Sequence, residues 1–203
     1  MIHNLFPTPV GLYALDRELS ASELSFIKGI SQHNNTGNTT SDDRNVLENK
    51  KLKKLRIFIE EKLNEYFKQV HDPKHDVRLA ITQSWCNYTN PGQFHHKHAH
   101  PNSFISGVFY VNADAEKDRI FFYKDGYQQL KLPPNEWNYW NSESWWFEAG
   151  TGGLVLFPSS LTHMVPNTES SETRISLSFN TFFEGQVGET NELTGLVIEG
   201  ARG

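Results

Sequence analysis

VRLAITQSWCNYTNPGQFHHKHAHPNSFISGVFYVN is the sequence of residues 77–112, where the chain changes from a helical to an extended pattern. The stretch is rich in Val, Ile, Thr and aromatic residues, which favour strands, and Pro, Gly and Asn interrupt it as turn signals. Short strands separated by such turns are typical of a sandwich or jelly roll. The same alternation continues downstream, and it predicts strands at 78–88, 93–99, 104–112, 118–123, 127–132, 144–148, 153–158, 161–165 and 173–183.

The residues before this stretch predict one strand and two helices. Residues 5–15 are expected to form an opening strand, and Ser20 and Glu23 have the spacing of a capping box at the start of a short helix. Residues 33–43 are polar and are expected to form a loop. A long helix is expected over about 44–70, because apolar residues recur every three or four positions. Helices followed by strands indicate an α+β fold, mainly β, with the N-terminal helices packed on one sheet.

The composition limits the class of protein. With 203 residues, the chain can form one domain with a sizeable core, and its net charge of −5 argues against nucleic acid as a partner. A single cysteine, Cys86, excludes an internal disulfide framework and suits a reducing compartment. We see neither a signal peptide nor an apolar run long enough for a membrane span, and we expect a cytoplasmic protein. The expected single domain has an N-terminal strand and helices (1–76), a jelly-roll core (77–184) and a C-terminal tail (185–203).

Four of the nine histidines lie within six residues. Because alternate side chains of a strand share a face, we expect His96, His98 and His100 on one face and His95, exposed, on the other. An H-x-H pair can present two imidazoles to one metal ion, and imidazole suits Fe, Zn, Cu and Ni. The late histidine, His163, is a candidate for a third ligand, although on its own it would equally be an ordinary half-buried side chain.

The last predicted strand has one polar face. In RISLSFN, residues 174–180, polar and apolar side chains alternate, and the polar ones are Arg174, Ser176, Ser178 and Asn180. A buried arginine is costly without a partner. A bound dicarboxylate would supply one, because a guanidinium group makes two parallel hydrogen bonds to a carboxylate. The alternative is that this face lies outside and that the arginine is solvated.

Residues 135–150, NEWNYWNSESWWFEAG, contain four of the five tryptophans. We expect Trp145 or Trp146 to alternate into the core of the sandwich. Loops commonly carry substrate contacts, so the aromatic residues before them are expected on a loop that covers the site or grips a peptide. These residues are Trp137, Tyr139 and Trp140.

These motifs together resemble one family. The order and spacing of Y-x-x-x-G-Q-F-x-x-x-H-x-H (88–100), SGVFYVN (106–112), GGLVLFPSSLTH (152–163) and RISLSFN (174–180) resemble the core strands of the iron(II)/2-oxoglutarate-dependent oxygenases. The chain is most similar to the prolyl-4-hydroxylase-like branch, and more narrowly to a group of such oxygenases in marine bacteria and their phages. The opening LFPTPV also resembles that group.

The resemblance implies a double-stranded β-helix, a cupin-like jelly roll, that binds Fe(II) and takes 2-oxoglutarate as cosubstrate. His98 and His100 match the proximal ligand pair, and His163 matches the distal histidine. Arg174 matches the residue that holds the C5 carboxylate of 2-oxoglutarate. Further candidates for the cosubstrate pocket are Tyr110, Ser176, Asn102 and Tyr88, and candidates for positions beside the ligands are His96, Ser178 and Asn180.

One position departs from the family pattern. The usual proximal carboxylate is His100 here, and three neutral imidazoles leave the ion with its full charge. Three explanations are open: the chemistry runs with three histidines, a carboxylate from another segment joins, or the metal serves a different purpose.

The implied function is a non-heme Fe(II)- and 2-oxoglutarate-dependent dioxygenase, a hydroxylase that yields succinate and carbon dioxide. Its substrate would be a prolyl or other protein side chain, or a small metabolite, and neither nucleic acid nor membrane is expected as a partner. A phage-encoded protein would act in the cytoplasm of the host. Two alternatives stay open: a three-histidine cupin-type dioxygenase without 2-oxoglutarate, and a non-catalytic jelly-roll protein that binds metal or is structural.

Overall fold

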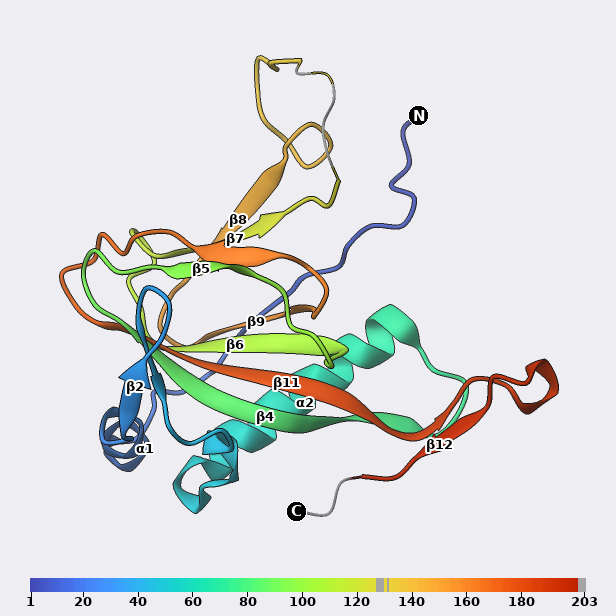
Figure 1. Ribbon diagram of the computed structural model, residues 1–203, viewed down its shortest axis with the longest axis horizontal. Coiled ribbons are helices and arrows are strands. Elements are labelled where there is room, and N and C mark those ends of the chain that lie inside the picture. Colours follow the sequence, from blue (N-terminus) through green and yellow to red (C-terminus); the bar gives the residue numbers. More distant parts are fainter. Residues whose placement is uncertain (127–129, 131, 201–203) are drawn as a thin grey trace.

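The computed structural model describes residues 1–126, 130 and 132–200, and these residues form two antiparallel sheets that face one another, with helices on the outer side of the larger sheet (Figure 1). The larger sheet has the order β1 (Gly11–Ala14), β9 (Gly153–Pro158), β6 (Ile105–Asn112), β11 (Arg174–Val187), β4 (Val77–Thr89), β3 (Thr39–Ser41) and β2 (Gln32–Asn34), with β12 (Leu196–Ile198) beside β11. The smaller sheet has the order β5 (His95–His98), β10 (His163–Val165), β7 (Arg119–Tyr123) and β8 (Ser144–Glu148). The predicted jelly roll is confirmed.

Most predicted strands are found within a few residues of their expected bounds. The opening strand is shorter than expected, because β1 covers only Gly11–Ala14 of the predicted 5–15. Of the strand predicted at 127–132, only residues 130 and 132 are described, and neither is in a strand.

Both predicted helices are present, and the start of the first agrees with the prediction whereas the start of the second does not. Helix α1 (Ala21–Lys28) begins at the predicted capping box: the Ser20 hydroxyl accepts from the Glu23 amide at 3.3 Å, and the Glu23 carboxylate accepts from the Ser20 amide at 2.7 Å. Helix α2 (Lys53–His71) begins nine residues later than the predicted start at 44.

The residues before α2 form two 3-10 turns, η1 (Val46–Glu48) and η2 (Lys50–Leu52), instead of the predicted helix. Side chains bind the backbone amides that an α-helix would use: the Ser84 hydroxyl accepts from Leu47 at 2.9 Å, and the Asn49 side chain accepts from Lys51 at 3.0 Å. Such local bonds compete with helical ones, which explains why the pattern of apolar residues alone extended the helix too far.

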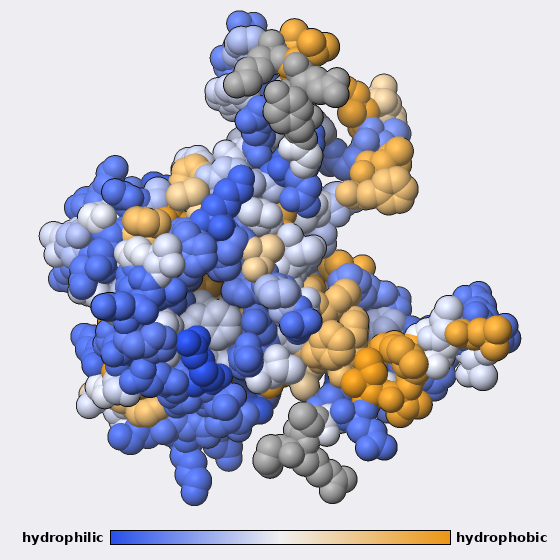
Figure 2. Space-filling view, in the orientation of Figure 1, coloured by the Kyte–Doolittle hydropathy of each residue, from blue (hydrophilic) through white to orange (hydrophobic). Residues whose placement is uncertain are grey.

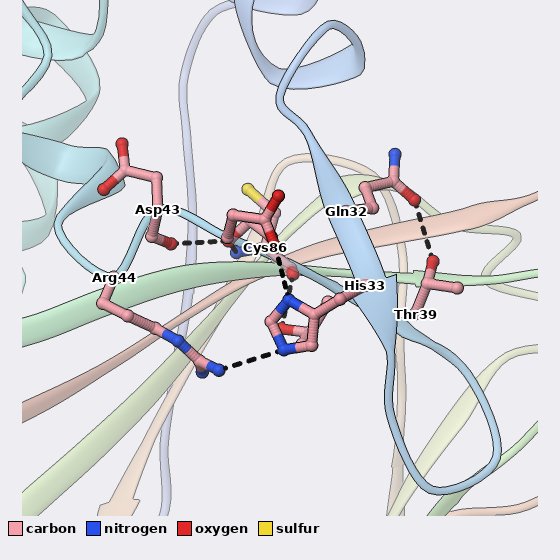
Figure 3. Close-up of polar contacts among 9 residues, drawn as sticks. Gln32, His33, Thr39, Asp43, Arg44 and Cys86 are labelled. Carbon is pink, nitrogen blue, oxygen red and sulfur yellow. Dashed lines mark hydrogen bonds and ion pairs between the residues drawn. The ribbon is translucent and has the colours of Figure 1, made fainter.

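The prediction of a loop at 33–43 is wrong, because β2 and β3 form a hairpin on the edge of the larger sheet. Its polar side chains bind one another (Figure 3): Nδ1 of His33 lies 2.6 Å from Oδ1 of Asp42, and the Thr39 hydroxyl donates to Gln32 at 2.8 Å. The hairpin is thus stabilised by polar contacts, which composition alone did not distinguish from a loop.

The predicted C-terminal tail also contains regular structure. Strand β11 extends to Val187, and after a 3-10 turn, η3 (Thr190–Glu192), the chain returns as β12 and pairs with the end of β11. The tail is therefore not a loose extension up to Ile198.

Two apolar cores lie on the two faces of the larger sheet. Helix α2 crosses the outer face of this sheet (Figure 1) and buries Leu55, Ile59, Leu63, Tyr66 and Phe67 there. Fully burying such a side chain contributes about 1.5–3 kcal/mol. The second core fills the space between the sheets and contains Val108, Tyr110, Ile120, Phe122, Val155 and Phe157. Successive side chains of β6 and β9 point alternately into the two cores, so each strand is buried on both faces.

Exposed apolar side chains gather in two places in Figure 2: at the top, where the N-terminal segment with Ile2, Leu5 and Phe6 lies against the arm between β7 and β8, and where α2, β4 and β11 end. On the arm, Trp137, Tyr139 and Trp140 are each more than half exposed, as predicted for a loop. Of the two tryptophans in β8, Trp145 is half-buried and Trp146 is exposed, so the core prediction holds in part for the first. No helix in the described ranges has the length and apolar character that a membrane crossing requires.

Candidate metal centre and cosubstrate pocket

His98 and His163 lie side by side on the smaller sheet. They are register partners on β5 and β10, with ring centroids 4.4 Å apart. Nδ1 of His98 donates to the His96 carbonyl at 2.7 Å, and Nδ1 of His163 donates to the Leu161 carbonyl at 3.0 Å. Since a carbonyl only accepts, each ring carries a proton on Nδ1, and each Nε2 is free to bind a metal ion.

His100 completes a group of three imidazoles. Its amide donates to the Ser159 carbonyl at 2.9 Å, which ties the residue to the end of β9. Its ring centroid lies 5.0 Å from that of His98 and 5.1 Å from that of His163, and the three rings offer nitrogens within 4.8 Å of one another. Among the residues that the structure describes, no Asp or Glu belongs to this group.

Burial keeps these imidazoles neutral. It lowers the pKa of His163 to about 3 and that of His100 to about 4, with a smaller contribution from the neighbouring rings, and it also lowers the pKa of His98. A metal ligand must be the neutral imidazole. The three side chains are therefore in the state that a metal ion requires at neutral pH.

His95 also points at this cluster, so the prediction that it is exposed on the opposite face is wrong. Across β10, His163 pairs with His98 but Val165 pairs with His95, so β5 contains one extra residue, a β-bulge. The bulge reverses the alternation and stacks the His95 ring on the His98 ring with centroids 4.7 Å apart.

Arg174 is buried between the sheets. The apolar side chains of β11, Ile175, Leu177 and Phe179, pack on the helix side, so its polar face points to the smaller sheet. Arg174 is only 2% exposed, and its Nη2 donates to the Thr89 hydroxyl at 3.4 Å. Its Nε and Nη1 have no hydrogen-bond partner among the described residues. The alternative of a solvated Arg174 is therefore excluded.

Tyr110 lies beside this guanidinium group, and its buried hydroxyl also lacks a partner in the part of the chain that the structure describes. Burial raises the pKa of Tyr110 to about 12, so the phenol is neutral. Burial lowers the pKa of Arg174, and this effect is partly offset by Tyr110 and Asp118. The Arg174 cation with two unpartnered nitrogens and the neutral Tyr110 hydroxyl form a site that suits an anion, since each unpaired buried donor costs about 1–3 kcal/mol.

The imidazole group and Arg174 both lie on the side of the larger sheet that faces the smaller sheet. Trp85 contacts the His100 ring, with centroids 5.8 Å apart, and pairs with Ser178 in the sheet. Arg174 lies four residues before Ser178 on β11, and at 3.3 Å per residue the two are about 13 Å apart along the strand.

Two predicted cosubstrate contacts are not supported. Tyr88 faces α1, because its hydroxyl donates to the Ile27 carbonyl at 2.6 Å and its ring belongs to the helix-side core. Asn102 lies on an exposed turn, and the adjacent Ser103 binds Thr181, which is seven residues from Arg174 along β11. Neither Tyr88 nor Asn102 therefore faces Arg174.

Asn87 is an interior residue that the sequence reasoning missed. Its side-chain amide donates to the Ser178 hydroxyl at 3.2 Å, and its buried Oδ1 has no partner within the described ranges. The signal was present, because Trp85, Asn87 and Thr89 alternate with the apolar residues of β4 and pair with the polar face of β11.

The remaining predicted residues line the same space. Ser176 is buried and pairs with both Asn87 and Tyr110 in the sheet. Asn180 accepts at 2.9 Å from the Ser106 hydroxyl near the imidazole end. His96 lies next to His98, with ring centroids 4.8 Å apart.

The comparisons with known proteins agree with this arrangement. Residues 83–180 match the model of the family described as "Putative 2OG-Fe(II) oxygenase". The matched segment begins within β4 and ends within β11, so it includes both sheets' central strands, the imidazole group and Arg174. No curated protein matches the chain.

Several solved structures share the fold. A 2OG-Fe(II) oxygenase family oxidoreductase from Burkholderia pseudomallei has 13% identity and a TM-score of 0.57, and 84% of each chain is covered. A Pseudomonas putida prolyl-4-hydroxylase has 14% identity and a TM-score of 0.56, covering 85% of this chain and 92% of that one. HygX from Streptomyces hygroscopicus, with nickel, 2-oxoglutarate and hygromycin B bound, has 10% identity and a TM-score of 0.59, covering 86% and 82%.

The family match and the fold lead to one assignment, while the narrower likeness to marine bacterial and phage proteins stays a prediction. Residues 83–180, just under half of the chain, match the 2OG-Fe(II) oxygenase family, and with the shared fold this match identifies an oxidoreductase that uses Fe(II) and 2-oxoglutarate.

Proposed function

We propose that the protein is a hydroxylase in which His98, His100 and His163 bind Fe(II), and in which Arg174 and Tyr110 bind the C5 carboxylate of 2-oxoglutarate. One observation carries the proposal: a buried guanidinium group with two unpartnered nitrogens lies on the interior face that leads to three converging imidazoles. A buried cation without a partner is destabilising, so a site that retains one is suited to an anionic ligand.

The donor sets fit both groups. Imidazole is an accepted ligand of iron, and guanidinium and phenol are donors to carboxylate. When bound, Fe(II) and 2-oxoglutarate supply the oxidation of a substrate C–H bond by O2, with release of succinate and carbon dioxide. The protein orients the ligands: the carbonyls of His96 and Leu161 fix two imidazoles through Nδ1, and burial of His163 and Arg174 limits the access of water to those two side chains.

We propose that His100 replaces the usual carboxylate ligand. This is supported by the convergence of its ring with the other two, and by the fact that no Asp or Glu of the described residues belongs to the group. Three neutral ligands leave the positive charge on the ion uncompensated, so the anionic 2-oxoglutarate gains electrostatic attraction that a carboxylate ligand would otherwise reduce.

For the substrate, we propose a prolyl or other protein side chain, with a small metabolite as the second candidate. The first rests on the sequence resemblance to prolyl hydroxylases and on the exposed aromatic side chains of the arm between β7 and β8. Aromatic side chains of this kind are enriched where proteins bind proteins. We also propose that the chain acts as a single oxygenase domain in the cytoplasm, which agrees with its one buried cysteine.

The decisive experiment is an anaerobic titration with Fe(II), with and without 2-oxoglutarate, that follows the weak visible charge-transfer band of the chelate. We expect a band that needs both components and that is absent in His163→Ala and Arg174→Ala. Iron binding without a band, together with activity that survives Arg174→Ala, would favour the three-histidine dioxygenase. A bound metal that ignores both 2-oxoglutarate and O2 would favour a non-catalytic protein.

A further inference from the structure

The bulge in β5 creates a second group of three histidines. One nitrogen of each of His95, His96 and His98 lies within 4.8 Å of the others, which is the same closeness found for the first group. The three rings are in mutual contact, with centroids 5.2 Å apart for His95 and His96, 4.7 Å for His95 and His98, and 4.8 Å for His96 and His98. A regular strand would have placed His95 on the opposite face.

His96 provides independent evidence that this group suits a ligand. Its Nδ1 is buried and has no hydrogen-bond partner among the described residues. A buried imidazole nitrogen without a partner is destabilising, and a metal ion would satisfy it. His96 is not part of the group assigned above, so the proposed catalytic centre does not explain this nitrogen.

The two groups share His98. Nδ1 of His98 donates to the His96 carbonyl, so only Nε2 is free. A single nitrogen atom binds one metal ion at a time, and therefore an ion held by one group removes a ligand from the other. The groups also differ in exposure, because His95 and His96 are half-buried whereas His163 is 6% exposed.

We propose that His95, His96 and His98 form an alternative, outer position for a divalent transition metal ion, in competition with the inner position formed by His98, His100 and His163. The outer position is inferred from its own geometry, and only the role given to the inner position rests on the proposed function. Imidazole ligands suit Fe, Co, Ni, Cu and Zn and disfavour Mg and Ca. An ion in the outer position leaves the inner one with two histidines, so outer occupancy opposes the 2-oxoglutarate-dependent reaction.

The test is an anaerobic Co2+ titration of the metal-free full chain, followed by calorimetry and by the visible spectrum before and after 2-oxoglutarate. We expect the wild type to bind one ion. His100→Ala/His163→Ala, which lacks two inner ligands, should still bind one ion, and its spectrum should not respond to 2-oxoglutarate. His95→Ala/His96→Ala should bind one ion and respond. His98→Ala, which damages both positions, should bind Co2+ more than about tenfold more weakly than either double variant.

Two results would overturn the outer position: His100→Ala/His163→Ala binding Co2+ no more tightly than His98→Ala, or two ions bound by the wild type. In both cases a spectral response of His95→Ala/His96→Ala to 2-oxoglutarate would leave the proposed function standing. Conversely, a response kept by the inner double variant and lost by the outer one would move the catalytic centre to His95, His96 and His98. Circular dichroism checks each fold, and glutamine versions replace any alanine variant that does not fold.

Discussion

His98 and His163 are opposite one another on antiparallel neighbours, β5 and β10, and each donates its Nδ1 proton to the carbonyl two residues before it in the chain. The two rings thus have the same tautomer for the same backbone reason, and their free Nε2 atoms meet on one side. In many metal sites a carboxylate holds the second nitrogen of a histidine ligand. Here backbone carbonyl groups accept these hydrogen bonds, and substitution of the side chains of His96 or Leu161 cannot remove the carbonyls.

Metal binding should stabilise the fold, because the imidazoles are neutral and in place before an ion arrives. At an Fe(II) concentration a hundred times Kd, the gain is about 2.7 kcal/mol. For a chain of this size, that corresponds to a rise in Tm of about 5–10 °C. Anaerobic thermal unfolding with and without Fe(II) measures it, and EDTA should reverse it. His98→Ala is the control, and an equal rise in that variant would show that the ion binds elsewhere.

Arg174→Met should separate cosubstrate binding from stability. The guanidinium group is buried with two unpartnered nitrogens, so an apolar side chain of similar length should leave Tm unchanged or raise it. Affinity for 2-oxoglutarate should fall at least tenfold, since hydrogen bonds to charged groups contribute about 1.5–3 kcal/mol. Calorimetry with 2-oxoglutarate and thermal unfolding give the two quantities. A large drop in Tm with intact affinity would mean that Arg174 is structural.

Tyr110→Phe and Tyr88→Phe form a matched pair. Each removes one buried hydroxyl, but that of Tyr110 has no partner among the described residues and lies between the sheets, and that of Tyr88 donates to the Ile27 carbonyl on the helix side. Tyr110→Phe should weaken 2-oxoglutarate binding about tenfold with little change in stability. Tyr88→Phe should lower the free energy of unfolding by about 0.5–1.5 kcal/mol or more and leave cosubstrate affinity unchanged. Equal effects of the two variants on affinity would contradict the assignment.

The part of the site that follows from strand alternation could be predicted from the sequence. Arg174 and Ser176 were placed on the polar face of β11 because the period of a strand is fixed by its geometry. On β4 the same rule places Asn87 on one face with Trp85 and Thr89, whereas Tyr88, a candidate from the family resemblance, is one residue away and therefore on the other face.

The rest depended on contacts between distant segments. The inward turn of His95 follows from a bulge that exists only where β5 pairs with β10, and no local signal marks it. The hairpin at 32–41 and the late start of α2 have a similar origin, because their polar side chains bind partners that the fold brings close, such as Ser84 for Leu47. Local sequence patterns therefore predict most of the helices and strands. The ends of these elements and the bulge in β5 depend on contacts with distant segments of the chain.

Gly107 should not accept a larger residue. A Cβ atom there would lie 2.2 Å from Cζ of Phe179 and 2.8 Å from Cδ2 of Leu156, both in the helix-side core. Gly107→Ala should therefore lower the free energy of unfolding by about 1–3 kcal/mol through overpacking. Denaturant unfolding measures it. Gly92→Ala is the contrast, because no atom lies within 4 Å of a Cβ added there. An alanine at this position would be strained only by the positive φ of 78°, which costs about 1 kcal/mol.

Cys86 should be unreactive in the native protein, and its reaction with a thiol reagent should measure how often the buried part of β4 becomes exposed. The thiol is fully buried on β4, and burial raises its pKa to about 12, so very little thiolate exists at pH 8. A thiol reagent should label the native protein slowly and the urea-unfolded protein at once. Fe(II) and 2-oxoglutarate should slow native labelling further, because ligands of the native state reduce the population of open forms. Rapid labelling of the liganded protein would instead show that β4 opens locally, without unfolding of the site.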